Sequence, residues 1–327
     1  MPANWQEFCQ IINSNQRFVL TSHIRPDCDA LGSELGMAGV LEALGKDVKI
    51  VNGQATPPNL AFLDPDNRIH CINESISADD LSDREVHIIL DTSAWAQLGA
   101  MGEFIRSAGI KTLIIDHHMG EDDIDAQLFK DTTAEATGRL VVEAADALGV
   151  DLTKEIAKPV FAALATDTGW YRFGSAQAHT YELAARLITA GADPAGIYGE
   201  LYEQETIGRL KLRGVILSRL VTELEGQLVH TFVRATDFAE TGAVPQDTED
   251  AINLSLSIAG TQAAVILVEQ QTGGFKISFR SRCKMDCSQV AAQFGGGGHK
   301  AAAGAFIEEP FELAQQKVLE AVRAAVQ

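Results

Sequence analysis

The first half of the chain alternates short apolar runs with longer stretches whose apolar residues recur at helical spacing. The stretches 30–44 and 103–108 are typical of helices, because each is followed by a glycine that can end it. Strands that alternate with helices predict a mostly parallel sheet covered by helices on both faces. The short apolar runs that predict its buried strands are 18–22, 47–52, 86–91 and 111–116.

Helical patterns dominate the middle of the chain, and strand-like patterns return after Gly226. We therefore predict an α/β protein with three parts: an N-terminal domain at 1–190, a helical connector at 191–225 and a smaller α/β domain with a mixed sheet at 226–327. The predicted middle helices are 138–148, 153–166, 178–190 and 205–223. The late strands are 228–233, 263–269, 275–279 and 305–307, and the late helices are 288–294 and a terminal one from residue 310.

Composition narrows the class of protein. The chain has 327 residues, of which 46% are hydrophobic and 22% charged, as in a soluble globular protein. No apolar run approaches the roughly 20 residues that span a bilayer, and the N-terminus does not resemble a signal peptide. The 5 cysteines are an odd number without a Cys-x-x-Cys pair, which favours free thiols in a reducing cytoplasm. We expect a cytoplasmic protein without a membrane partner.

Charge limits the kind of ligand. The net charge of −19 and the pI near 4.7 argue against a protein that coats long nucleic acid, because binding to the phosphate backbone needs a basic surface. A small phosphate-bearing ligand remains compatible, since divalent cations and a few arginines can reverse the field inside a cleft.

Acidic and histidine side chains gather where the predicted strands end. The loop after the first strand reads His-x-x-x-Asp-x-Asp, the third and fourth strands each end in Asp, and two histidines follow the fourth. In an open α/β sheet, ligand sites form outside the carboxyl ends of the strands. A further Asp ends a helix that could pack beside them. The candidate residues are His23, Asp27, Asp29, Asp91, Asp116, His117, His118 and Asp167.

These three imidazoles and five carboxylates predict a metal site. So many like charges close together disfavour joint ionisation unless cations offset them. A single Asp at a strand end is most often a turn or cap residue, but several segments here place such residues at matching positions of one sheet. Mixed histidine and carboxylate ligation suits Mn²⁺, Co²⁺, Fe²⁺ or Zn²⁺ better than Ca²⁺ or Mg²⁺. Two ions roughly 3.5–4 Å apart can clamp a phosphoryl group for attack by water.

With these motifs, the sequence resembles the DHH phosphoesterase family, which is named for the motif found here as Asp116-His117-His118. The other N-terminal motifs are 22–33, 90–93 and 166–169, and the second half resembles the DHH-associated C-terminal domain. The resemblance implies one metal ion at His23, Asp27 and Asp91, and a second at Asp29, His117 and Asp167, with Asp91 bridging. It implies that His118 faces the substrate, as phosphate ligand or as proton donor to the leaving oxygen. It also implies that Asp116 fixes the tautomer and orientation of a histidine, which makes His118 and Asp116 the candidate catalytic residues. The implied cofactor is two divalent ions, Mn²⁺ first, with Co²⁺, Fe²⁺, Mg²⁺ or Zn²⁺ as alternatives.

The C-terminal motifs predict a phosphate-binding surface. Glycines let a phosphate or ribose approach the backbone closely, and a nearby arginine can bind a terminal phosphate with two hydrogen bonds. On a strand, residues two apart share a face, which groups Arg280 with Arg282. The candidate substrate-binding residues are Arg280, Ser281, Arg282, Gly296, Gly297, Gly298 and His299, and we expect the active-site cleft between the two domains.

Within the family, the sequence looks most like the group of nanoRNases and pAp phosphatases. This resemblance implies hydrolysis of short oligoribonucleotides and dinucleotides to mononucleotides, with action on the 3′-phosphate of pAp. Inorganic pyrophosphatase or exopolyphosphatase activity is the alternative within enzymes, and a nucleotide-binding sensor with weak activity is the alternative outside them. The sequence fixes neither the polarity of attack nor the oligomeric state, although a homodimer is compatible with it.

Overall fold

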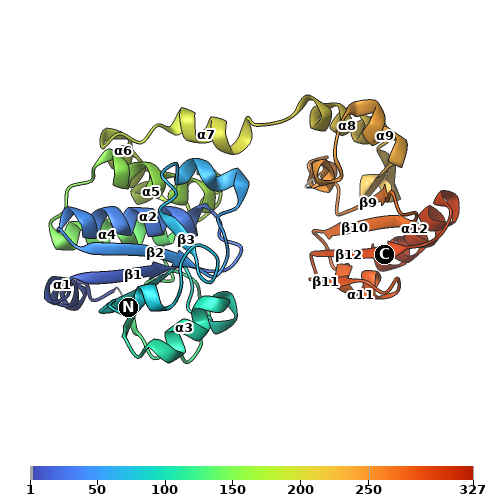
Figure 1. Cartoon of the computed structure of the whole chain (residues 1–327). Coiled ribbons are helices and arrows are strands. Elements are labelled where there is room, and N and C mark those ends of the chain that lie inside the picture. The colour runs from blue at the N-terminus through green and yellow to red at the C-terminus, as the bar shows by residue number, and fades with distance from the viewer. Residues whose placement is uncertain (1–2, 250, 327) are drawn as a thin grey trace. The chain divides into compact units, whose positions relative to one another are not determined.

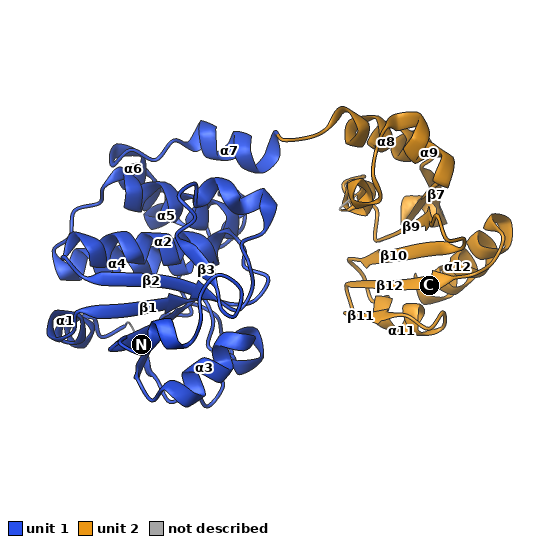
Figure 2. Cartoon of the chain, viewed as in Figure 1, with its two compact units in different colours: residues 1–203 blue, residues 204–327 orange. Residues whose placement is uncertain are grey.

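The computed structural model describes residues 3–249 and 251–326. Contacts divide the chain into two compact units, 1–203 and 204–327 (Figures 1 and 2). The helix α7 (Pro194–Tyr202) belongs to the first unit and α8 (Ile207–Ser218) to the second. The domain boundaries at 190 and 226 remain predictions. In the described residues, no helix combines the length and the apolar composition needed to cross a membrane.

The first unit is built on a six-stranded sheet in the order β3-β2-β1-β4-β5-β6, in which every neighbouring pair is parallel. The four predicted strands correspond to β1, β2, β4 and β5. The sequence pattern missed the two edge strands, because one has only three residues and the other is half polar. The strands are β1 (Arg17–Thr21), β2 (Asp47–Asn52), β3 (Ile69–Cys71), β4 (Val86–Leu90), β5 (Lys111–Asp116) and β6 (Gln127–Lys130).

Helices cover both faces of this sheet, as predicted. Alternate residues of β1 point to opposite faces, so Phe18 packs in the larger core and Val19 in the smaller one. The smaller core contains α3 (Ala100–Ala108). The larger core contains α1 (Trp5–Ser14), α2 (Cys28–Ala43), α4 (Thr137–Leu148), α5 (Lys154–Asp167) and α6 (Ala178–Thr189) (Figure 1).

Close packing of α2 against α5 brings two parts of the candidate site together. A Cβ atom at Gly32 would collide with the carbonyl oxygen of Pro159, so only glycine permits this approach. The N-terminus of α2 follows Asp27, and α5 ends at Asp167. The helix pair therefore carries both acidic residues to one edge of the sheet.

The second unit contains a mixed six-stranded sheet in the order β11-β12-β10-β9-β8-β7. Among the described residues of this sheet, β8 and β9 form a parallel pair and the other neighbouring strands are antiparallel. The strands are β7 (Val221–Glu223), β8 (Leu228–Val233), β9 (Ala263–Glu269), β10 (Phe275–Ser281), β11 (Gly297–Gly298) and β12 (Ala302–Ile307). The helices, besides α8, are α9 (Ala235–Thr241), α10 (Ala251–Leu256), α11 (Cys287–Ala292) and α12 (Phe311–Val326).

One predicted helix is shorter than expected. The sequence pattern extended it over 205–223, whereas α8 ends at Ser218 and Val221–Glu223 form β7. The β-branched pair Val221-Thr222 favours a strand, and β7 pairs with β8. Tertiary pairing thus overrides the helical periodicity there.

Candidate metal centre

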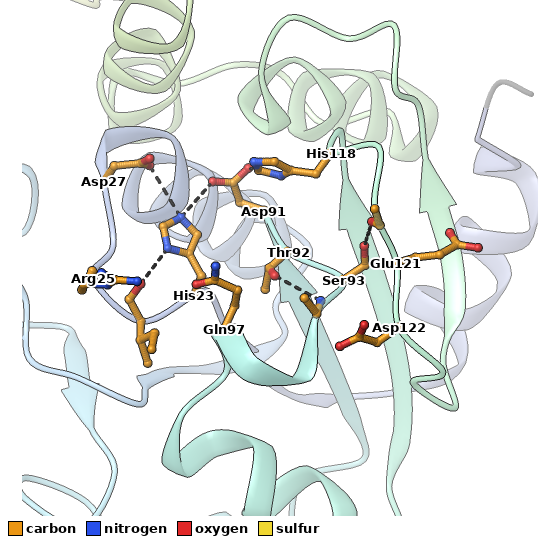
Figure 3. A pocket seen from close by; sticks show the side chains of 13 residues that line it. His23, Arg25, Asp27, Asp91, Thr92, Ser93, Gln97, His118, Glu121 and Asp122 are labelled. Atoms are coloured by element: carbon orange, nitrogen blue, oxygen red, sulfur yellow. Dashed lines mark hydrogen bonds and ion pairs between the residues drawn. The ribbon is translucent and has the colours of Figure 1, made fainter. Parts of the chain in front are cut away.

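The candidate residues meet at the carboxyl edge of the first sheet, where the chain order reverses. From β1 the sheet continues through β2 in one direction and through β4 in the other, so the loops after β1 and β4 diverge. His23 follows β1, Asp91 follows β4, and His117 and His118 follow β5. Figure 3 shows His23, Asp27, Asp91 and His118 around the same cavity.

The first group of donors consists of His23, Asp27 and Asp91. His23 Nε2 lies 3.4 Å from Asp91 Oδ2 and 3.9 Å from Asp27 Oδ1. His23 Nδ1 lies 3.0 Å from the carbonyl oxygen of Ile24, which can only accept, so Nδ1 carries the proton. The lone pair of Nε2 then faces two carboxylates, which is the arrangement that a cation between them would complete.

The second group consists of Asp29, His117 and Asp167. His117 Nε2 lies 3.7 Å from Asp29 Oδ2 and 3.5 Å from Asp167 Oδ2. Its Nδ1 lies 3.1 Å from the carbonyl oxygen of Ala134, so this imidazole also keeps a lone pair on Nε2. The six donors thus come from the ends of three strands and two helices.

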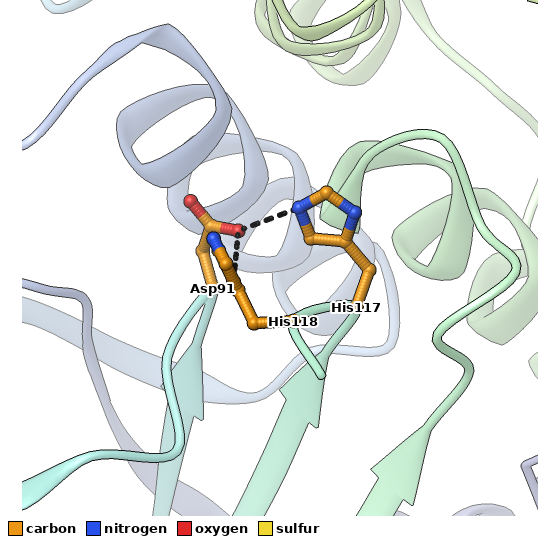
Figure 4. Close-up of side chains that lie close together, drawn as sticks. All are labelled: Asp91, His117 and His118. Carbon is orange, nitrogen blue, oxygen red and sulfur yellow. Dashed lines mark ion pairs between the residues drawn. The ribbon is translucent and has the colours of Figure 1, made fainter. Parts of the chain in front are cut away.

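Asp91 lies between the two groups. Its Oδ2 faces His23, and its Oδ1 lies 3.6 Å from His117 Nε2 (Figure 4). The residue has a φ of 63°, a left-handed conformation that non-glycine residues adopt at a cost. This backbone conformation turns the carboxylate toward both histidines.

Two of the carboxylates are buried without a lysine or arginine partner. Asp29 is 1% and Asp91 2% exposed, and burial raises the pKa of both above the ordinary range. In the described residues, their ion-pair partners are histidines only. Buried carboxylates that face imidazole lone pairs need positive charge, so this donor set fits divalent cations.

The N-terminus of helix α4 donates hydrogen bonds to these buried carboxylates. The backbone amides of Thr137 and Gly138 donate to Asp29 at 2.7 and 2.9 Å, and the Thr137 hydroxyl donates to Asp91 Oδ1 at 2.8 Å. Anions are favoured at a helix N-terminus, where amides lack intrahelical partners. Neither residue is among those predicted from the sequence, where the only sign of them is their place at the start of a predicted helix.

His118 stands apart from the two groups. Its side chain is 55% exposed, and its Nδ1 lies 2.8 Å from Asp116 Oδ1. Burial opposes ionisation of Asp116, but hydrogen bonds from His118 and Ser93 lower its pKa to about 2. The same bond to Asp116 raises the pKa of His118. A third set of donors, Asp91, His117 and His118, also lies within 4.8 Å, so geometry alone permits His118 as a ligand.

The cavity beside the cluster has a volume of about 770 Å³, which suits a small ligand. Beyond the cluster residues, side chains with hydrogen-bonding groups line it, among them Arg25, Ser93 and Gln97 (Figure 3).

The candidate substrate residues lie in the second unit. Arg280 is half-buried near the end of β10, and the buried Ser281 hydroxyl accepts a hydrogen bond from the Cys283 amide. Arg282 donates to the carbonyl oxygen of Leu256 at the end of α10. His299 is exposed, and its amide donates to the carbonyl oxygen of Ala302.

The glycine run forms a tight turn. Gly297 and Gly298 make up β11 and pair with Gly304 and Ala303 of β12. A Cβ atom at Gly296 would collide with the carbonyl oxygen of Gly304, whereas one at Gly297 would meet nothing within 4 Å. Gly296 is therefore required by packing, and Gly297 leaves open space above the backbone.

Comparison with known proteins gives matches along most of the chain. Residues 17–164 match the DHH family, N-terminal domain, and residues 225–327 match the DHHA1 domain. A Thermus thermophilus protein named bifunctional oligoribonuclease and PAP phosphatase is 31% identical over 93% of this chain and 88% of its own length. The Bacillus subtilis protein of the same name is 26% identical over 92% of each chain. A solved structure of an exopolyphosphatase-related protein from Bacteroides fragilis matches with a TM-score of 0.81, at 25% identity over 98% of this chain and 95% of that one.

Proposed function

Because this chain belongs to the DHH family of metal-dependent phosphoesterases, we propose that it hydrolyses short oligoribonucleotides and dinucleotides to mononucleotides and also removes the 3′-phosphate of pAp. The observation that carries the proposal is the position of Asp91, whose two oxygens face two separate groups of donors. The match to the Thermus protein along most of both chains supports the nucleotide substrate.

The donor geometry supports two ion positions. His23 and Asp27 would hold one ion and Asp29, His117 and Asp167 the other, with Asp91 shared. When bound, the two ions polarise a phosphoryl group and acidify the water that attacks it. Mixed imidazole and carboxylate donors favour Mn²⁺, and Co²⁺, Fe²⁺, Mg²⁺ or Zn²⁺ are alternatives.

His118 is the proposed proton donor or phosphate ligand, with Asp116 as the residue that orients it. Because Asp116 accepts the Nδ1 proton, Nε2 is the nitrogen left to meet the substrate. The raised pKa of His118 favours the doubly protonated ring, which can donate to a phosphoryl oxygen or to the leaving oxygen. The exposed position of His118 at the cavity is compatible with this role.

The second unit would hold the rest of the nucleotide. Arg280 and His299 offer donors for a terminal phosphate, and the open space over Gly297 permits close approach to the backbone. We assign Ser281, Arg282, Gly296 and Gly298 to the support of this surface, since they contact other residues of the second unit.

A substrate panel with purified protein and added Mn²⁺ tests the function. It contains pApA, a five-residue RNA, a long single strand, pAp, pyrophosphate and polyphosphate, with Asp91→Ala as the inactive control. Release of mononucleotides from pApA that is lost in the control supports the proposal. Activity only on pyrophosphate or polyphosphate would overturn it, a result that the exopolyphosphatase-related structural neighbour makes worth measuring. Nucleotide binding without turnover would indicate a sensor.

We also propose that the protein is cytoplasmic and forms a homodimer. All five cysteines are free thiols, which is compatible with the reducing cytoplasm. Light scattering after gel filtration would decide between a monomer and the homodimer.

A further inference from the structure

Lys130 is a partly buried lysine next to the proposed site, and it is not among the residues predicted from the sequence. It is the last residue of β6, and its side chain is 10% exposed. The ammonium nitrogen lies 3.1 Å from Asp116 Oδ2, 2.8 Å from Ser93 Oγ and 2.6 Å from the carbonyl oxygen of Gly120. The ammonium group donates hydrogen bonds to Ser93 and Gly120 and forms ion pairs with Asp116 and, at 3.9 Å, with Glu121.

The contact between Lys130 and Asp116 follows from strand pairing. In the parallel pair β5 and β6, Asp116 and Lys130 are register partners, so the two side chains lie next to each other at the edge of the sheet. In the described part of the chain, Asp27, Asp29, Asp91 and Asp167 form ion pairs with histidines, whereas Asp116 also pairs with an ammonium group.

Both oxygens of Asp116 are therefore occupied by protein groups. Oδ1 accepts from the amide and Nδ1 of His118, at 3.1 and 2.8 Å. Oδ2 faces the Ser93 hydroxyl at 2.7 Å and Lys130. A carboxylate held on both sides is fixed in plane and direction, and it is not free to serve as a metal ligand.

The same ammonium group also fixes a wall of the cavity. Gly120 and Asp122 line the cavity on the loop after His118. Lys130 holds the Gly120 carbonyl, while the Asp122 amide donates to the Ser93 carbonyl oxygen at 2.8 Å. Removing the lysine would take one hydrogen bond from the Gly120 carbonyl oxygen, which the Ser93 hydroxyl also approaches at 2.7 Å, and would leave Asp116 with one fewer partner.

We propose that Lys130 is a positioning residue of the phosphoesterase site: it fixes Asp116 and the Gly120 loop, and through Asp116 it orients the His118 imidazole toward the substrate. This inference rests on the proposed function, because it takes His118 as the group that meets the phosphate. A lysine that only stabilised the fold would give a different result, since its loss would lower the amount of folded enzyme and leave turnover per folded molecule unchanged.

The kinetic test compares Lys130→Met and Lys130→Arg with the wild type, on pApA and on the activated diester bis(4-nitrophenyl) phosphate. Lys111→Met is the matched control, since Lys111 is an exposed lysine at the start of β5. For Lys130→Met, we expect kcat to fall roughly ten- to a hundred-fold, with KM and Mn²⁺ affinity within about two-fold of wild type. Lys130→Arg keeps the charge and should retain most of the wild-type kcat. Lys111→Met should have the kcat of the wild type.

Three results would overturn the proposal: wild-type kcat in Lys130→Met, a loss confined to KM, or a loss explained by weaker Mn²⁺ binding. If Lys130→Met does not fold, as judged by circular dichroism, Lys130→Gln carries the same test, because it keeps a hydrogen-bond donor without the charge.

A second readout does not depend on activity. In metal-free protein with ¹⁵N-labelled histidine, the wild type should show His118 with its proton on Nδ1, assigned by loss of the signal in His118→Gln. We expect the signal to persist in Lys130→Arg and to broaden or disappear in Lys130→Met through exchange between ring orientations. An unchanged signal in Lys130→Met would contradict the positioning role. If the wild type hydrolyses neither substrate, the proposed function fails. The spectrum still tests whether Lys130, through Asp116, orients the His118 ring.

Discussion

The Thr137 hydroxyl donates a hydrogen bond of 2.8 Å to Asp91 Oδ1, the oxygen that also lies 3.6 Å from His117 Nε2. The two partners are 46 residues apart, and Thr137 is the first residue of α4. In the proposed site, Asp91 serves two cations and must keep both oxygens in fixed directions, and this bond fixes one of them.

Thr137→Val removes that hydroxyl with little change in shape. We expect Mn²⁺ affinity to fall roughly ten- to a hundred-fold, because ligands that lose an orienting hydrogen bond bind metal less well. Thr137→Ser keeps the hydroxyl and should retain most of the affinity. Isothermal titration with Mn²⁺ measures both, and equal affinities for the valine variant and the wild type would show that Asp91 does not need this bond.

The His118→Gln variant distinguishes between two roles of His118, proton donor and metal ligand. If His118 acts on the substrate, kcat on pApA should fall about 100-fold or more, while Mn²⁺ affinity stays within about two-fold. The alternative donor set of Asp91, His117 and His118 makes the opposite prediction, a marked loss of Mn²⁺ binding. Titration calorimetry beside single-turnover kinetics distinguishes the two roles.

We expect different results when each of two neighbouring glycines is replaced by alanine. Gly296→Ala should destabilise the second unit, because its Cβ would collide with the Gly304 carbonyl oxygen. Gly297→Ala should fold normally, since nothing lies within 4 Å of the added Cβ. If substrate approaches the backbone there, Gly297→Ala should raise KM for pApA several-fold without lowering Tm. An unchanged KM would remove Gly297 from the substrate surface.

Glu34 makes stability depend on pH. The side chain is 0% exposed, and its Oε2 accepts from Asn52 Nδ2 at 2.9 Å. Burial raises the pKa of Glu34 from the ordinary 4.5 to about 8. The folded state therefore keeps a proton that the unfolded state loses above pH 4.5, and this contribution to stability declines as pH rises toward 8, by up to about 1.4 kcal/mol per unit.

Glu34→Gln removes this dependence while keeping an acceptor for Asn52. The Tm of the metal-free variant relative to wild type should rise steadily between pH 5 and pH 8 in thermal scans. A Tm difference that is constant over this range would mean that Glu34 does not keep its proton in the fold.

Much of the site could be predicted from the sequence, for a physical reason. Buried parallel strands read as apolar runs, and their carboxyl ends meet at one edge of the sheet. Residues such as Asp91 and His117 directly follow such runs, so the local pattern predicts that they lie at the same edge of the sheet. Asp167 required one more step, because its place beside the others depends on the packing of α5 against α2.

The supporting contacts could not be predicted, because no local pattern connects their partners. Lys130 ends a short, half-polar edge strand, and only the pairing of β6 with β5 places it against Asp116. Thr137 looked like the beginning of a helix, and only the position of α4 directs its hydroxyl to Asp91.

By itself, the sequence determined the α/β class of fold and the family, and it indicated the residues proposed to bind metal, because periodicity and residue chemistry are local properties. The tertiary structure decided how those residues are held. It set the left-handed turn at Asp91, the amides of α4 behind Asp29 and the ammonium group beside Asp116. Such contacts depend on strand order and helix packing, which bring together residues far apart in the chain.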